Sequence, residues 1–269
     1  FAETIKYSPS SFVDFARWIK SIIMHPLTAM NKEKQLSAAY RGAYQRADYV
    51  VLLCQSFINS YGVFAGIQDQ SKYMVIPNAL SFDITTSFDK LSKQKEVLIV
   101  ARFDEPSKRL SLALRIWERV KQDPVAKDWV LRIVGEGNSR ELYERIIHNE
   151  QIPDVFLEGR QDPIPYYKEA SIFMMTSRSE SWGLTLTEAQ QMGVVPIAFD
   201  TYASLREIIT NDENGVVIEE GDIDSYVNRM KILMSDKKLC QRMAKQAIES
   251  SQRFSQERIA EMWWELLSK

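Results

Sequence analysis

The stretch SIFMMTSRSESWGLTLTEAQQMGVVPIAFD, residues 171–200, holds a complete strand–loop–helix–strand pattern. The continuous apolar runs Ile172–Met175 and Val194–Ala198 are typical of buried strands. Between them, a polar loop leads into a helix predicted over Leu184–Met192. Two consecutive strands joined through a helix run parallel, because a parallel connection needs a crossover. This stretch therefore predicts an α/β fold with a parallel sheet.

The same alternation continues on both sides of that stretch. Further strands are predicted at Val97–Ala101, Trp129–Val134 and Val155–Leu157, with helices at Leu110–Val120, Arg140–Asn149 and Ile164–Glu169. The last part of the sequence predicts helices at Asp222–Ser235, Lys237–Ser250 and Gln256–Leu267. Strands alternating with helices in this way indicate a doubly wound domain, whose sheet is covered on both faces.

The first 80 residues predict the tail of another α/β domain. The expected elements are a helix from Ser10 or Ser11 to Met24, a helix at Lys32–Arg46, a strand at Tyr49–Leu53, a helix capped by Ser56 and a strand at Tyr73–Ile76. The first of these helices has an apolar face, which predicts burial in the domain or, alternatively, contact with a membrane. The polar stretch Ser81–Lys95 is interpreted as the connection between the two domains.

Composition narrows the class of protein. The chain has 269 residues, of which 45% are hydrophobic and 26% charged, so two ordinary globular domains are expected. Basic and acidic residues are interspersed and the net charge is -2, which disfavours a nucleic-acid partner. Two distant cysteines argue against a disulfide framework or a metal cage. No signal peptide or long apolar span is visible, and the cytoplasm is the expected compartment.

Candidate site residues follow the predicted strands, since ligands of doubly wound sheets bind outside the carboxyl ends of the strands. Arg102 follows the first strand, and Lys108 with Arg109 is expected to open the next helix, a suitable pair of cations for a diphosphate. Surface ion pairs are the alternative role for these cations. Gly135-Glu136-Gly137 and Glu158-Gly159-Arg160 follow the next two strands. The first of these motifs is also compatible with an ordinary tight turn, and the second is weak evidence when taken alone.

The loop after Met175 carries the most informative pattern. Glu180 lies in the loop, and the backbone amides of Trp182 to Thr185 are expected at a helix N-terminus, where phosphate groups bind. Ionised carboxylates such as Glu180 and Glu188 can accept hydrogen bonds from sugar hydroxyls. Alternatively, Glu180 is a solvated loop residue, and Glu188 is a first-turn glutamate favoured by the helix dipole.

Taken together, these motifs resemble those of glycosyltransferase family 4, a group of retaining enzymes with the GT-B architecture. The two glutamates of the family, separated by seven residues, correspond to Glu180 and Glu188 around Trp182-Gly183-Leu184, and its Arg and Lys clamp to Arg102 and Lys108. Gly135-Glu136-Gly137, Met192–Pro196, Arg206-Glu207-Ile208 and Asn214-Gly215-Val216 follow the order expected of the family. The resemblance covers Val75 to the end of the chain.

The resemblance implies a role for each of these residues. Arg102, Lys108 and Glu180 would be catalytic, the cations by neutralising the diphosphate of a nucleotide sugar and Glu180 by holding the sugar hydroxyls. Glu188 would bind the ribose. The other donor contacts implied are Ser181, Trp182, Gly183, Leu184, Thr185, Gly135, Gly137 and Arg160. No metal or cofactor is expected, and the partners would be a nucleotide-sugar donor and a glycan or lipid-linked acceptor.

The resemblance also implies a division of the chain into three parts. Residues 1–85 would be a partial acceptor-side domain truncated at its N-terminus, 86–253 the donor-binding domain, and 254–269 a helix that packs back toward the first domain. His25 is a candidate for the family's N-terminal-domain histidine by position alone, and a structural role at a helix end is favoured.

Several positions depart from the family pattern. Ala101, Arg109 and Ser181 stand where the family usually has glycine, and Tyr202-Ala203-Ser204 replaces a glycine pair, so the donor sugar can differ. The expected function is transfer of a hexose-type sugar. A non-catalytic nucleotide-sugar-binding fragment and a GT-B sugar-nucleotide epimerase are the alternatives, and the paired glutamates favour the transferase.

Overall fold

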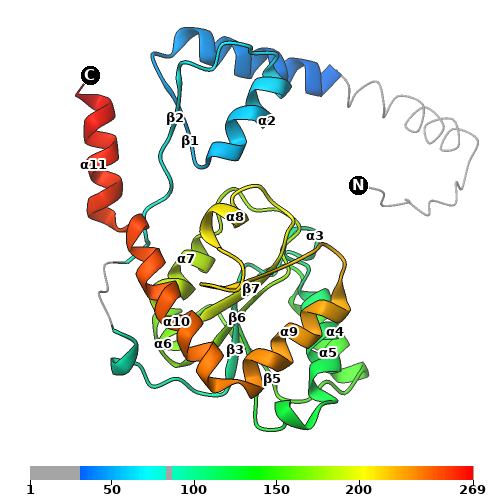
Figure 1. Ribbon diagram of the computed structural model, residues 1–269. Helices are drawn as coiled ribbons and strands as arrows, with labels where there is room; N and C mark the ends of the chain where they lie inside the picture. The colour runs from blue at the N-terminus through cyan, green and yellow to red at the C-terminus, as the bar shows by residue number, and fades with distance from the viewer. Residues whose placement is uncertain (1–30, 83–86, 269) are drawn as a thin grey trace, which may run out of the picture. The chain divides into compact units, whose positions relative to one another are not determined.

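The computed structural model describes residues 31–82 and 87–268 (Figure 1). The chain forms two compact units, Phe1–Val51 with Ile58–Met74 and Leu52–Phe57 with Val75–Lys269. The predicted boundaries at residues 85 and 253 stay a prediction. The helix expected to end at Met24 and the candidate His25 lie outside the described residues.

The described residues from 31 to 75, most of which belong to the smaller unit, have the predicted order of helix, strand, helix and strand. Residues 31–46 are helical, and β1 (Val50–Leu52), α2 (Gln55–Ala65) and β2 (Tyr73–Val75) follow, with β1 and β2 as hydrogen-bonded neighbours. Aromatic side chains hold the helix to the strand, since the rings of Tyr44 and Tyr73 have centroids 4.8 Å apart. The Tyr44 hydroxyl also donates to the carbonyl oxygen of Asp69 at 2.6 Å.

The larger unit is built on a six-stranded parallel sheet. Its strands are β3 (Glu96–Val100), β4 (Val130–Val134), β5 (Val155–Gly159), β6 (Ile172–Met175), β7 (Val195–Phe199) and β8 (Val216–Ile218). They lie in the order β5-β4-β3-β6-β7-β8, and every neighbouring pair is parallel. The direction of winding reverses between β3 and β6, which places the ligand crevice of such a fold at their carboxyl ends. The predicted doubly wound α/β fold is confirmed.

Helices cover both faces of this sheet (Figure 1). One face packs against α4 (Leu110–Lys121), α5 (Arg140–Asn149) and α9 (Ile223–Ser235), and the other against α6 (Ile164–Glu169), α7 (Leu184–Gln191) and α8 (Leu205–Ile208). Side chains that alternate along β3 therefore enter different cores, Val97 and Ile99 on the first face and Leu98 on the second. The helices α10 (Lys237–Ser251) and α11 (Gln256–Leu267) follow.

Short elements escaped sequence prediction. The strand β8 has three residues, and the helices α3 (Glu105–Lys108) and α8 have four each, little more than one helical turn. Three 3-10 turns were also missed, at Phe88–Lys90, Pro124–Ala126 and Gln252–Phe254. None of the helices within the described ranges is both long and apolar enough to span a bilayer.

The predicted helix after β3 begins at Leu110 with Arg109 as its N-cap, as expected, but the prediction that Lys108 also opens this helix was wrong. A separate short helix, α3, begins at Glu105 with Pro106 in its first turn and ends at Lys108. Proline fixes a backbone angle suited to a helix start, which explains why a turn of helix forms here. Arg109 then adopts a left-handed conformation, with φ 51°, and α4 begins at Leu110. Lys108 and Arg109 thus form a corner between two helices.

Candidate active site

A cleft of about 360 Å³ lies at the carboxyl ends of β3 and β6. Its lining comes from the segments that follow these strands, from Lys108 at the end of α3, and from Asn78 after β2. The lining residues are Asn78, Val100, Ala101, Arg102, Lys108, Glu180, Ser181, Trp182, Gly183, Leu184 and Thr185. The structure therefore brings together eight of the twelve predicted site residues at the switch point of the sheet.

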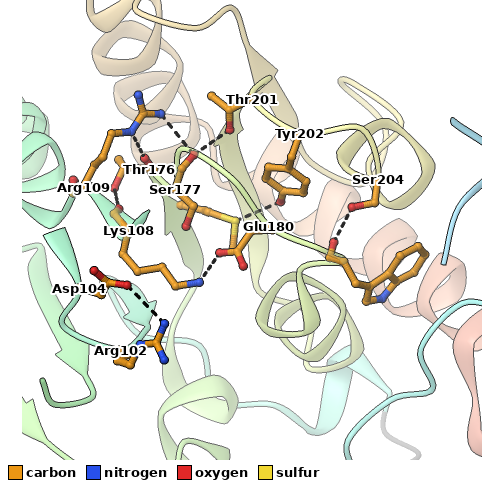
Figure 2. A network of polar contacts seen from close by, with 12 residues as sticks. Arg102, Asp104, Lys108, Arg109, Thr176, Ser177, Glu180, Thr201, Tyr202 and Ser204 are labelled. Atoms are coloured by element: carbon orange, nitrogen blue, oxygen red, sulfur yellow. Dashed lines mark hydrogen bonds and ion pairs between the residues drawn. The ribbon is translucent and has the colours of Figure 1, made fainter. Parts of the chain in front are cut away.

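An ion pair between Lys108 and Glu180 lies in this cleft. The Nζ atom of Lys108 is 2.5 Å from Oε1 of Glu180, and the two side chains are 18% and 16% exposed (Figure 2). Lys108 comes from α3 and Glu180 from the loop between β6 and α7, so the fold joins groups 72 residues apart in the sequence. Both charged groups are largely desolvated, yet both line the cleft. Each could therefore leave its partner and bind a ligand, Lys108 an anion and Glu180 a hydroxyl group.

The N-terminus of α7 forms another side of the cleft. Gly183 precedes the helix in a left-handed conformation, with φ 102°, and no side chain caps it. The first amides of a helix lack partners within the helix, and they carry the positive end of its dipole. Trp182 holds the backbone that leads into α7. It is 2% exposed and packs edge-on against Phe254, and its carbonyl oxygen accepts a hydrogen bond from the Ser204 hydroxyl at 2.9 Å. This end of α7 is suited to an anion.

Arg102 lines the cleft with its side chain 73% exposed. Its Nη2 atom is 3.3 Å from Oδ2 of Asp104, its near neighbour in the sequence (Figure 2). Such an exposed pair contributes little to stability, so the guanidinium can leave Asp104 at low cost.

Glu188 points into the protein rather than the cleft. It is 8% exposed, and its two oxygens accept hydrogen bonds from the hydroxyls of Ser81 and Tyr167, the latter at 2.9 Å. Burial, and then the neighbouring carboxylate of Glu188, raise the pKa of Tyr167 well above its usual range. Tyr167 therefore stays protonated and donates to Glu188.

The two glycines of the Gly135-Glu136-Gly137 motif do not line the cleft. A Cβ atom on Gly135 would lie 1.9 Å from the carbonyl oxygen of Ala101, and one on Gly137 would lie 2.5 Å from that of Phe103. Both have positive φ, 145° and 153°. These glycines let two backbone segments pack together, a requirement that exists without any ligand.

Arg160 also lies outside the cleft lining. Its side chain is 83% exposed and forms an ion pair with Glu136 at 3.5 Å. Exposed ion pairs of this kind form without any ligand. Its role in binding a donor stays a prediction.

Two residues near the site were not predicted as site residues. Asn78 lines the cleft and lies three residues after the end of β2, in a post-strand position like those of the predicted residues, a signal that was available in the sequence. Tyr202 lies beside Glu180 in Figure 2, and its hydroxyl donates to Sδ of Met175 at 3.1 Å. Burial, and then the charge of Glu180, raise the pKa of Tyr202. Tyr202 therefore fills space beside Gly183 as a neutral phenol.

The family described as glycosyl transferases group 1 has a model that matches residues 83–250, more than half of the chain. The chain belongs to this family. It is 23% identical over 265 residues to the poly(glycerol-phosphate) alpha-glucosyltransferase of Bacillus subtilis, covering 96% of this chain and 38% of that protein. It is 29% identical to the amylovoran biosynthesis glycosyltransferase AmsD of Erwinia amylovora, covering 65% of this chain and 49% of the relative. The chain thus spans less than half of either relative.

Solved structures share the GT-B fold. Anabaena HepE in complex with UDP and glucose superimposes with a TM-score of 0.74 at 21% identity, covering 88% of this chain and 67% of HepE. A mutant of Staphylococcus aureus TarM in complex with fondaparinux, alpha-GlcNAc-glycerol and UDP gives the same TM-score at 22% identity, covering 84% of this chain and 45% of TarM. These likenesses show the fold, a parallel sheet with flanking helices, which agrees with the strand order described above.

Proposed function

We propose that this chain provides the donor-binding part of a retaining glycosyltransferase of family 4, which transfers a hexose-type sugar from a nucleoside diphosphate sugar to a glycan, lipid-linked or polyol-phosphate acceptor. The observation that carries the proposal is the Lys108–Glu180 pair, which lies in one cleft with the N-terminus of α7. A cation, free amides and a carboxylate match the diphosphate and hydroxyl groups of such a donor.

The geometry supports a defined division of work. Lys108 would leave Glu180 and bind the diphosphate together with the amides at Gly183 to Thr185, while Arg102 would turn from Asp104 toward the same charge. These positive groups stabilise the negative charge that grows on the diphosphate as the bond to the sugar breaks. Glu180, freed of Lys108, would accept hydrogen bonds from the sugar hydroxyls. We propose that the cations take the role a metal ion has in other transferases.

Retention of configuration and the place of the nucleoside are the finer parts of the proposal. The resemblance to family 4 supports attack on the same face of the sugar, with the leaving phosphate accepting the proton of the acceptor. A ribose bound by Glu188 would replace the Ser81 hydroxyl, which now occupies one of its oxygens. The presence of UDP in the TarM and HepE complexes favours a uridine donor.

The acceptor and the compartment rest on relatives alone. The Bacillus subtilis relative is named for poly(glycerol-phosphate) and the Erwinia amylovora relative for amylovoran biosynthesis, which favours a polymer as the acceptor. Synthesis of such a polymer from nucleotide sugars would place the protein in the cytoplasm, with peripheral contact at the membrane where a lipid-linked acceptor is held.

Calorimetric titration with UDP, GDP and ADP tests the donor site. We expect one nucleotide, UDP, to bind the wild-type protein, and Arg102→Ala to weaken its binding by roughly tenfold to a hundredfold, the loss of about one charge-assisted hydrogen bond. Arg119→Ala is the matched control, since Arg119 is 45% exposed, pairs with Asp224 and lies in the last turn of α4, away from the cleft. Equal affinity of Arg102→Ala and Arg119→Ala for UDP would remove Arg102 from the site.

A further inference from the structure

Arg109 stands beside Lys108 but serves a different set of atoms. Its Nε donates to the carbonyl oxygen of Thr176 at 2.7 Å, and its Nη2 to that of Ser177 at 3.2 Å. Its Nη1 pairs with Glu220 at 3.1 Å. In Figure 2 the Arg109 guanidinium points toward Ser177, while the Lys108 side chain extends away from it toward Glu180. The 16%-exposed Arg109 side chain therefore binds protein and does not line the cleft.

These bonds belong to a seam between two backbone segments. Residues 107–109 carry Lys108, and residues 176–178 lead to Glu180. The Thr176 hydroxyl contacts the carbonyl oxygens of Lys108 and Arg109 at 3.0 and 3.1 Å, and the amide of Arg178 donates to the carbonyl oxygen of Ser107 at 2.8 Å. Arg109 contributes the two charge-assisted bonds of this seam, which are stronger than the neutral ones.

The backbone of Arg109 is held in a conformation that favours glycine. Its φ of 51° lies in the left-handed region, which costs a residue with a Cβ atom and costs glycine nothing. The sequence nevertheless carries arginine at this corner. Its side chain makes two bonds to the carbonyl oxygens of Thr176 and Ser177, which a glycine could not make.

We propose that Arg109 is a positioning residue for sugar transfer: it holds the loop of Glu180 in register with Lys108 after the donor has separated the two side chains. The inference rests on the proposed function. The Lys108–Glu180 pair itself also joins α3 to the loop. Once the diphosphate binds Lys108 and the sugar binds Glu180, the ion pair is broken, and the bonds made by Arg109 still connect the two segments.

Three variants of the full-length protein separate the contribution of the side chain from that of the backbone. Arg109→Gly removes the side chain and relieves the left-handed strain. Arg109→Ala removes the side chain and keeps the strain, and Arg109→Lys keeps one charged donor. Glu220→Gln is the control, since Glu220 is 55% exposed and its loss leaves both carbonyl bonds in place. Steady-state transfer from a UDP-sugar, thermal midpoints and amide hydrogen exchange of residues 176–182 are measured for each.

Arg109→Gly and Arg109→Ala are expected to lower kcat/KM for the donor by at least tenfold per folded molecule, with faster exchange in residues 176–182. Arg109→Lys is expected to recover part of both losses, and Glu220→Gln to behave as wild type. The inference would be overturned if transfer activity depended only on the folded fraction, so that Arg109→Gly, which is less strained, were more active than Arg109→Ala. Unchanged hydrogen exchange in residues 176–182 would also overturn it. A wild-type protein that transfers no sugar would contradict the proposed function instead, and the exchange measurement would still decide the role of Arg109.

Discussion

Replacing Lys108 with alanine is expected to lower the rate of sugar transfer by roughly 10² to 10³-fold, the usual cost of removing one preorganised group from a developing anion. The Nζ atom of Lys108 lies in the cleft, 2.5 Å from Glu180, and it is the least exposed cation of the lining. Turnover is measured in the full-length protein with a UDP-sugar. Glu180→Ala is expected to abolish transfer in the same way, because the sugar would lose the carboxylate that holds its hydroxyls.

A loss of folding could imitate this result, because Lys108→Ala leaves Glu180 largely buried without its partner. That loss is expected to be about 1–3 kcal/mol of the free energy of unfolding. The double variant Lys108→Met and Glu180→Gln removes both charges, so it should regain stability and still fail to transfer. Lys121→Met is the matched control, since Lys121 is 6% exposed and pairs with Asp154 at 2.7 Å on the far end of α4. Transfer by Lys108→Ala at the rate of Lys121→Met would refute the catalytic role of Lys108.

The fold of the larger unit was predictable because its strands are continuous apolar runs and its helices are periodic. The stretch from Ile172 to Ala198 gave β6, α7 and β7 to within one or two residues. The order of strands in the sheet does not follow from such patterns, because the contact between β3 and β6 joins residues 75 apart, such as Val97 and Ile172. Helices of four residues, such as α3 and α8, also complete little more than one turn and so show no helical period.

The sequence predicted which residues of the candidate site follow the strands. It did not predict which side chains those residues contact. Rules of topology place Arg102 and Glu180 at one edge of the sheet, and the structure has both in the cleft. The pairing of Lys108 with Glu180, the burial of Glu188 against Tyr167 and the turn of Arg109 toward the carbonyl of Thr176 depend on tertiary packing. No local spacing in the sequence encodes these contacts.

The sequence pattern and the structure give different reasons for a glycine at position 135. The pattern suggests close approach of a ligand, and the structure shows close packing of two backbone segments. A glycine that lets a ligand approach the backbone can be replaced by alanine with loss of binding and little loss of stability. A glycine that lets two backbone segments touch cannot, because the added Cβ atom would lie 1.9 Å from the carbonyl oxygen of Ala101. Neither partner is a flexible side chain, so β3 and the β4–α5 loop would have to separate.

Gly135→Ala is therefore expected to lower the free energy of unfolding by at least about 3 kcal/mol, the range of severe packing defects. Gly221→Ala is the matched control, because Gly221 also has a positive φ, 85°, but no atom within 4 Å of the position of its Cβ. That variant should lose only about 1–2 kcal/mol from backbone strain. Urea unfolding of both variants measures the difference. If Gly135→Ala is as stable as Gly221→Ala and binds UDP more weakly than wild type, then Gly135 serves the ligand as the sequence motif suggests, and the close contact with Ala101 is not what requires glycine at this position.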